Sequence, residues 1–114
     1  MQSPPLLVAC LCAAWCRTCD DYRTTFDTLA AAPEAAGERW VWVDIEDDEA
    51  LLGDIDVVDF PTLLVARGAQ VVFFGPVLPH AATARQLLAR ARAGELRAGD
   101  NPQLTALAQR IAGA

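Results

Sequence analysis

Residues 6–19 read LLVACLCAAWCRTC, an unbroken apolar run that is followed at once by a Cys-x-x-Cys motif. The run from Leu6 to Cys12 has the length and composition of a β-strand that is buried on both faces. Beyond the motif, apolar side chains recur at the spacing of one helix face, at Cys19, Tyr22, Phe26 and Leu29. We therefore expect a buried strand that passes into an amphipathic helix, with the motif at the junction.

The position of the motif gives its two cysteines different roles. Cys16 lies where the strand passes into the helix, and the N-terminus of a helix favours a thiolate through its free N–H groups and dipole. Cys19 lies about one turn further along, on the apolar face of the helix. We expect Cys16 to attack a substrate disulfide and Cys19 to resolve the resulting mixed disulfide. Arg17 favours the Cys16 thiolate, whereas Asp20 and Asp21 oppose it.

The rest of the chain predicts a single small α/β domain over residues 1–114. Strands are expected at 40–45, 62–66 and 70–74, the last two joined by a turn at 67–69. Helices are expected around Leu51 and Leu52, after Pro79, and over residues 100–112. The last of these has Asn101 as a good N-cap and Pro102 at the first helical position.

The composition excludes several classes of protein. With 54% hydrophobic and 21% charged residues the chain is an ordinary globular protein. Its net charge of −6 argues against nucleic acid as a partner. No apolar run reaches the roughly 18 residues of a membrane span, and no Lys or Arg precedes the short apolar stretch before Cys10, as a signal peptide would require. We therefore expect a cytoplasmic protein with no membrane partner.

Two motifs together resemble those of the thioredoxin family. Trp15-Cys16-Arg17-Thr18-Cys19 is similar to the family's Trp-Cys-x-x-Cys active site, and Phe60-Pro61-Thr62 is similar to its cis-proline loop. The resemblance covers about residues 6–93. It implies an α/β thioredoxin fold that lacks the usual first strand and helix, with a mixed sheet of about four strands and helices on both faces. Residues 100–112 would be an additional C-terminal helix.

The resemblance also implies an activity and its site residues. The chain is expected to be a thiol-disulfide oxidoreductase, a protein disulfide reductase that works as a monomer with a dithiol reductant and needs no cofactor. Pro61 is expected to be cis and to keep the backbone of Phe60 near Cys16, where it pairs with an extended substrate chain. The substrate-binding or supporting residues are expected to be Trp15, Arg17, Thr18, Phe60, Pro61 and Thr62.

Cys10 and Cys12 leave alternatives open. They have the same parity on the first strand and so point to the same face. The favoured interpretation is that they are small buried hydrophobes, and the alternative is a second redox step in which Cys10 or Cys12 exchanges with the Cys16–Cys19 pair. A less favoured arrangement is a four-cysteine zinc site, although we expect no metal. Because Cys10 stands where the family commonly carries a buried acid, a thioredoxin-fold interaction module with little redox activity is the alternative function.

Overall fold

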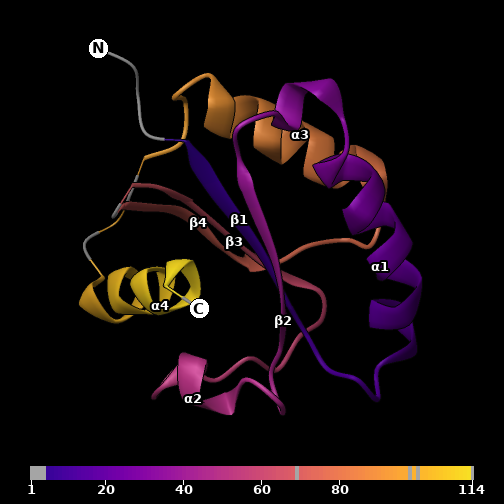
Figure 1. Ribbon diagram of the computed structural model, residues 1–114, viewed down its shortest axis with the longest axis vertical. Coiled ribbons are helices and arrows are strands. Elements are labelled where there is room, and N and C mark those ends of the chain that lie inside the picture. Colours follow the sequence, from indigo (N-terminus) through magenta and orange to yellow (C-terminus); the bar gives the residue numbers. More distant parts are fainter. Residues whose placement is uncertain (1–4, 69, 98, 100, 114) are drawn as a thin grey trace.

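The computed structural model describes residues 5–68, 70–97, 99 and 101–113. A single mixed sheet has the strand order β2-β1-β3-β4 (Figure 1). The strands are β1 (Leu6–Cys12), β2 (Arg39–Asp44), β3 (Thr62–Arg67) and β4 (Gln70–Pro76). The helices are α1 (Arg17–Ala30), α2 (Glu49–Leu52), α3 (Ala81–Arg92) and α4 (Pro102–Ala112), with a 3₁₀ turn at Pro33–Ala35. Strand β1 runs parallel to β2 and antiparallel to β3, and β4 is antiparallel to β3, which confirms the expected mixed sheet.

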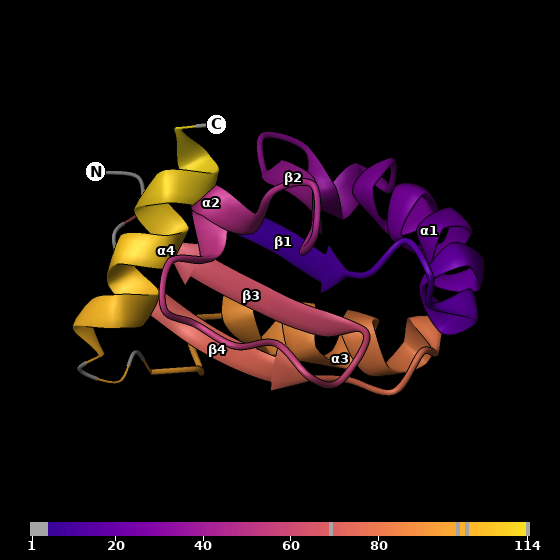
Figure 2. The ribbon, with the colours of Figure 1, turned by 90° about the horizontal axis from the view of Figure 1, so that it is seen from below.

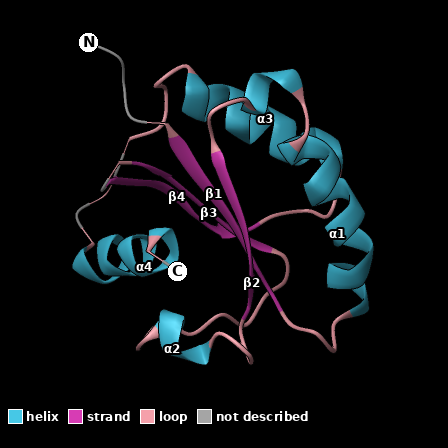
Figure 3. Ribbon diagram, in the orientation of Figure 1, coloured by secondary structure: helices cyan, strands magenta, loops and turns pink. Residues whose placement is uncertain are grey.

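Helices cover both faces of this sheet (Figures 2 and 3). Helices α1 and α3 pack on one face, and α2 and α4 pack on the other. All seven residues of β1 are buried, because successive side chains of a strand point to opposite faces and here each face has a core. Val8, Cys10 and Cys12 face α1 and α3, whereas Ala9 and Leu11 face α4. The shared orientation predicted for Cys10 and Cys12 is confirmed.

The additional C-terminal helix begins where the sequence places it. The Asn101 side chain accepts hydrogen bonds from the backbone N–H groups of Gln103 and Leu104, at 3.0 and 3.2 Å. These bonds satisfy two of the donors that a helix N-terminus leaves free. The face of α4 that meets the sheet carries Leu107, Ala108 and Ile111, all of them buried. Helix α4 therefore closes the second hydrophobic core.

A single arginine fixes α4 to the short helix α2. The Arg110 guanidinium donates from Nε to the Leu51 carbonyl at 2.6 Å and from Nη2 to the Leu52 carbonyl at 3.2 Å. These are carbonyls that the end of α2 cannot pair within the helix. Gly53 follows with a φ of +59°, and a Cβ there would lie 2.9 Å from Arg110 Nη2. The backbone conformation therefore requires glycine, and a larger side chain would also displace the Arg110 guanidinium.

The element boundaries differ from the sequence prediction by one or two residues. Strand β2 begins at Arg39, and β4 continues through Gly75 to Pro76, where a proline is tolerated because the strand ends there. Ala69 in the expected turn and Asp100 at the start of the expected last helix lie outside the described residues. Over the part of the chain that is described, no helix has the length and apolar content needed to cross a membrane.

Candidate functional site

The Cys-x-x-Cys motif lies at the junction of β1 and α1, as the sequence predicts. Cys16 is the N-cap residue of α1 and has an extended backbone. Its N–H donates to the Ala13 carbonyl, and its own carbonyl accepts from the Asp20 N–H, both at 3.1 Å. The first bond closes the turn after the strand, and the second opens the helix. The Cys16 side chain is half-buried and carries a free thiol.

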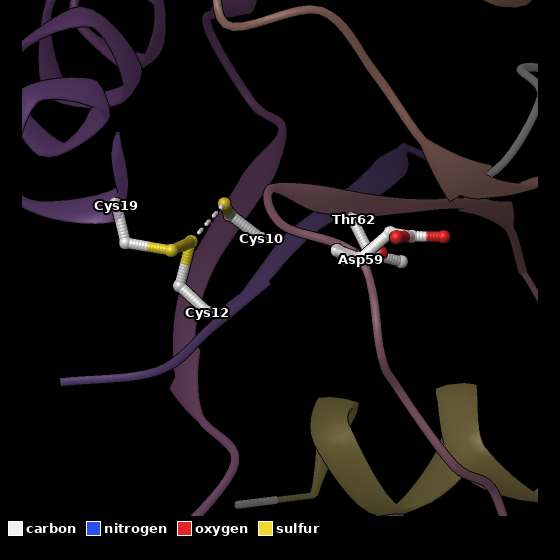
Figure 4. The surroundings of a disulfide bond; sticks show 5 residues. All are labelled: Cys10, Cys12, Cys19, Asp59 and Thr62. Atoms are coloured by element: carbon white, nitrogen blue, oxygen red, sulfur yellow. Dashed lines mark hydrogen bonds between the residues drawn. A yellow bond between two sulfur atoms is a disulfide. The ribbon is translucent and has the colours of Figure 1, made fainter. Parts of the chain in front are cut away.

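Cys19 is joined by a disulfide to Cys12, not to Cys16 (Figure 4). The Cα atoms of Cys12 and Cys19 are 5.8 Å apart, which is the usual separation for a disulfide. The bond forms because the last residue of β1 faces the first turn of α1, and both cysteines are only 1% exposed. The pairing of Cys19 therefore differs from the sequence-based expectation. The interpretation of Cys12 as only a small buried hydrophobe is wrong.

Cys10 adds a third sulfur to this cluster. Its Sγ lies 3.8 Å from the Sγ of Cys12, and a dashed line in Figure 4 marks the hydrogen bond between these two sulfur atoms. Because Cys12 has no thiol proton in the disulfide, Cys10 is the donor. Burial raises the pKa of the Cys10 thiol to about 12, against a smaller lowering by the positive charge of Arg23. At neutral pH Cys10 is therefore a protonated thiol that can donate a hydrogen bond to its neighbour.

The Tyr22 hydroxyl is a buried polar group in the same core. The Tyr22 side chain is 1% exposed, and its hydroxyl has no hydrogen-bond partner among the described residues. Burial raises the pKa of Tyr22 to about 12, and negative charge on Cys10 contributes to the same rise. The environment of the sulfur cluster therefore disfavours any anion that lacks a hydrogen bond.

The Phe60-Pro61-Thr62 motif forms a loop that hydrogen bonds hold in place. The Phe60–Pro61 peptide bond is cis. The Thr62 hydroxyl donates to the carbonyl of Asp59, three residues earlier, at 2.6 Å, and Figure 4 shows both residues. The Pro61 carbonyl accepts from the Val77 N–H at 3.0 Å. The Thr62 side chain thus helps to shape the loop, and it is buried.

The two motifs meet through their aromatic side chains. The Trp15 and Phe60 rings lie edge to face with centroids 5.5 Å apart. Trp15 is nevertheless 70% exposed, and Val58 and Leu78, at 79% and 64%, are the other strongly exposed large apolar side chains in the described residues. Val58 lies two residues before Phe60, and Leu78 follows the residue whose N–H bonds the Pro61 carbonyl. We call Trp15, Val58, Phe60 and Leu78 the apolar rim.

Sequence reasoning identified only half of this rim. Trp15 and Phe60 came from the motifs, whereas Val58 and Leu78 were missed. Neither residue belongs to a motif or to a predicted strand or helix, and nothing in their spacing indicates exposure. Their shared location becomes visible only once the loop at Pro61 and the end of β4 are placed side by side.

The remaining predicted residues follow Cys16 in the first turn of α1. Arg17 is exposed and Thr18 is half-buried. Over the described part of the chain, no three His, Cys, Asp or Glu side chains are grouped so as to hold a metal ion. The four-cysteine zinc alternative therefore gains no support, since Cys12 and Cys19 bond to each other.

Comparisons with known proteins agree on the fold. No protein-family model and no curated protein matches the chain. The structure of the germline-specific thioredoxin Deadhead of Drosophila melanogaster matches with a TM-score of 0.66 at 20% identity, covering 75% of this chain and 80% of that one. The thioredoxin of Fasciola hepatica gives 0.67 at 20% identity, covering 77% and 82%. The Trxlp protein of Edwardsiella tarda gives 0.66 at 22% identity, covering 75% and 84%. The chain has a thioredoxin-like fold.

Proposed function

We propose that this chain is a thiol-disulfide oxidoreductase that exchanges disulfides with protein substrates, with Cys16 as the attacking sulfur and Cys19 as the resolving sulfur. The observation that carries the proposal is the pair of environments at the start of α1. Cys16 is a free, half-buried cysteine at the N-cap, while Cys19 in the first turn is buried and already takes part in a disulfide. The thioredoxin-like fold supports the same activity.

The proposed reaction has two exchange steps. The Cys16 thiolate attacks one sulfur of the substrate disulfide, which forms a mixed disulfide and releases the first substrate thiolate. The Cys19 thiolate then attacks the Cys16 sulfur and releases the second substrate thiolate. Residues three apart on a helix place their Cβ atoms about 5–6 Å from each other, close enough for this second step. A dithiol reductant returns the electrons by the reverse route, with no bound cofactor.

The apolar rim favours a protein over a small molecule as the substrate. Exposed apolar groups that gather on one part of a surface are typical of protein-binding sites. Here Trp15 contacts Phe60, Val58 belongs to the segment that leads to Phe60, and Leu78 follows the residue that bonds the Pro61 carbonyl. A substrate chain that lies over the rim would bring its disulfide to Cys16, the partly exposed cysteine beside Trp15.

The test is insulin reduction with dithiothreitol as electron source, followed by trapping of the mixed disulfide. Cys16→Ser should reduce the rate to that of dithiothreitol alone, because no sulfur remains to attack insulin. In a separate reaction without dithiothreitol, the pre-reduced Cys19→Ser chain should instead accumulate a covalent complex with an insulin chain, because the mixed disulfide cannot be resolved. Thr28→Ser, at an exposed position on the same helix, is the control and should react like the unmodified chain.

A Cys16→Ser variant with unchanged reductase activity would overturn the proposal. The interaction-module alternative would then take its place, since the rim could still bind a partner without exchange chemistry. Far-UV circular dichroism of each variant separates loss of chemistry from loss of fold.

A further inference from the structure

The proposed reaction does not use the disulfide that the structure contains. In the structure the oxidised pair is Cys12 and Cys19, and Cys16 keeps its thiol. Both disulfide partners are 1% exposed and belong to the core between the sheet and helices α1 and α3. Cys19 is therefore the one cysteine with a role in both pairs, the proposed bond to Cys16 and the observed bond to Cys12.

We propose that Cys12 is a second resolving cysteine. After each reaction it forms a disulfide with Cys19 and so returns Cys16 to a free thiol. This inference rests on the proposed function, because it begins from the Cys16–Cys19 disulfide that resolution would form. After the exchange the disulfide is the buried Cys12–Cys19 bond, and the half-buried Cys16 is available for another substrate.

The relay adds one exchange step that balances. The Cys12 thiolate attacks the Cys19 sulfur, the Cys12–Cys19 bond forms, the Cys16–Cys19 bond breaks, and Cys16 leaves as a thiolate. Over the whole sequence the Cys12 and Cys19 thiols lose two electrons and two protons. The substrate disulfide gains both and becomes two thiols. The oxidant is the substrate itself, so no further reactant is needed.

Burial gives the relay its direction. While Cys16 is bonded to Cys19, any negative charge on Cys12 lies in an apolar core, where it is strongly disfavoured. The exchange moves that charge to Cys16, which is half-buried and at a helix N-terminus. Cys10 assists the step, because its thiol lies 3.8 Å from the Cys12 sulfur and can donate a hydrogen bond to it. The final state is the one that the structure contains.

The relay also predicts how the protein is reduced again. A thiol reductant must approach a sulfur to attack it, and neither Cys12 nor Cys19 is accessible. Reduction then has to begin with the Cys16 thiolate attacking Cys19, which brings the disulfide back to the surface. Cys16 thus controls both the entry and the exit of electrons.

The first experiment maps the disulfide after one turnover. The fully reduced chain is mixed with one equivalent of 5,5'-dithiobis(2-nitrobenzoic acid), the released thiolate is counted, and free surface thiols are alkylated with iodoacetamide without denaturant. Trypsin cleaves after Arg17 and Arg23, so Cys19 is isolated on residues 18–23 while the other three cysteines remain on residues 1–17. Fragment spectra of the linked peptides then locate the label and the bond.

For the unmodified chain we expect the label on Cys16 and the bond between Cys12 and Cys19. The Cys12→Ala variant should release the same amount of thiolate but end with a Cys16–Cys19 bond and an unlabelled Cys16. A Cys16–Cys19 bond in the unmodified chain, with Cys12 still a thiol, would overturn the relay and leave the proposed function standing. If no thiolate is released at all, both proposals fail.

A second variant tests the relay without changing either partner of the buried disulfide. In Cys16→Ser the Cys12–Cys19 disulfide should still form when the reduced chain is refolded in air, because both thiols are exposed in the unfolded chain and neither partner has changed. Its reduction by dithiothreitol in native buffer should be slower than in the unmodified chain by roughly tenfold or more, since the surface entry point is lost. Reduction in denaturant should be equally fast for both chains. Equal rates in native buffer would overturn the relay.

Discussion

The rings of Trp15 and Phe60 lie edge to face, with centroids 5.5 Å apart, and this contact links the two sequence motifs in space. Edge-to-face pairs are stabilised by the positive ring edge over the negative ring face. Trp15 is held beside the half-buried Cys16 by this contact and yet remains 70% exposed. The pair is therefore suited to hold one part of the apolar rim in a fixed position beside the proposed attacking sulfur.

Trp15→Ala should weaken the reaction with protein substrates more than the reaction with small disulfides. The loss of rim area and of the aromatic pair predicts a roughly threefold to tenfold lower kcat/KM for insulin reduction. The rate of the first thiolate release from a small aromatic disulfide should change less, because that probe does not cover the rim. Gln103→Ala, at an exposed position on α4, is the control. Equal effects on both substrates would contradict a protein-binding role for Trp15.

Local patterns in the sequence were sufficient for most of the fold. The buried strand β1 runs from Leu6 to Cys12 as predicted, because an apolar run of that length fits a strand covered on both faces. The helical spacing of Cys19, Tyr22, Phe26 and Leu29 predicts the buried face of α1. The Asn101 cap places the start of α4. Each of these follows from residues close together in the chain.

The disulfide partner of Cys19 could not be predicted in the same way. The sequence favours Cys16, because a Cys-x-x-Cys motif is a local pattern with a known geometry. Whether Cys12 is closer depends on how the end of β1 faces the first turn of α1, which is set by packing. The same holds for Leu78, which joins the apolar rim because Val77, the residue before it, donates to the Pro61 carbonyl, a contact between residues distant in sequence. A signal was present in the parity of Cys10 and Cys12, which turns both sulfurs toward α1.

In the ion pair between Glu38 and Arg92, replacing the arginine should destabilise the protein more than replacing the glutamate. Arg92 donates from Nε and Nη2 to the two carboxylate oxygens at 2.8 and 2.9 Å. The Glu38 side chain is only 8% exposed, against 25% for Arg92. Arg92→Met leaves a buried carboxylate that still accepts from the Trp40 Nε1–H at 3.2 Å but has lost both bonds from the arginine. We expect Arg92→Met to lower the free energy of unfolding by about 2–3 kcal/mol.

Glu38→Gln should cost only about 1 kcal/mol, because the arginine that remains can be hydrated. The matched control is the surface pair of Arg23 and Asp27, at 3.6 Å with both side chains more than half exposed. Asp27→Asn should change stability by less than about 0.5 kcal/mol. Urea unfolding of the three variants measures these differences. A larger loss for Glu38→Gln than for Arg92→Met would contradict the assignment of the burial penalty to the carboxylate.

Asn101→Ala should destabilise α4 through the loss of its N-cap. The Asn101 side chain accepts two backbone hydrogen bonds, and an alanine accepts none. We expect a loss of about 1 kcal/mol in the free energy of unfolding. Asn101→Asp keeps the acceptor and adds a negative charge at the positive end of the helix, so it should be neutral or slightly stabilising. Thermal unfolding of both variants provides the comparison, and equal losses would show that the cap contributes little.

Tyr22→Phe should stabilise the protein at neutral pH. The substitution removes a buried hydroxyl that has no partner among the described residues and keeps the ring in place. We expect the free energy of unfolding to rise by about 1 kcal/mol. Urea unfolding at pH 7.5 measures it. A loss of stability would mean that the hydroxyl is satisfied by a group such as an ordered water.

The same residue should make the protein sensitive to alkaline pH. Burial raises the pKa of Tyr22 from 10.0 to about 12 and that of Cys10 from 9.0 to about 12. Between a group's pKa in the unfolded chain and its pKa in the folded chain, the unfolded chain has released a proton that the folded chain keeps. The free energy of unfolding therefore falls as pH rises, by about 1.4 kcal/mol per pH unit for each group. Below about pH 8 both groups are protonated in both states and contribute no pH dependence. In Tyr22→Phe only the Cys10 contribution remains, so the decline in stability between pH 10 and pH 11 should be about half as steep as in the unmodified chain. Unfolding of both chains measured in parallel at each pH isolates Tyr22, and an unchanged slope would contradict its titration in this range.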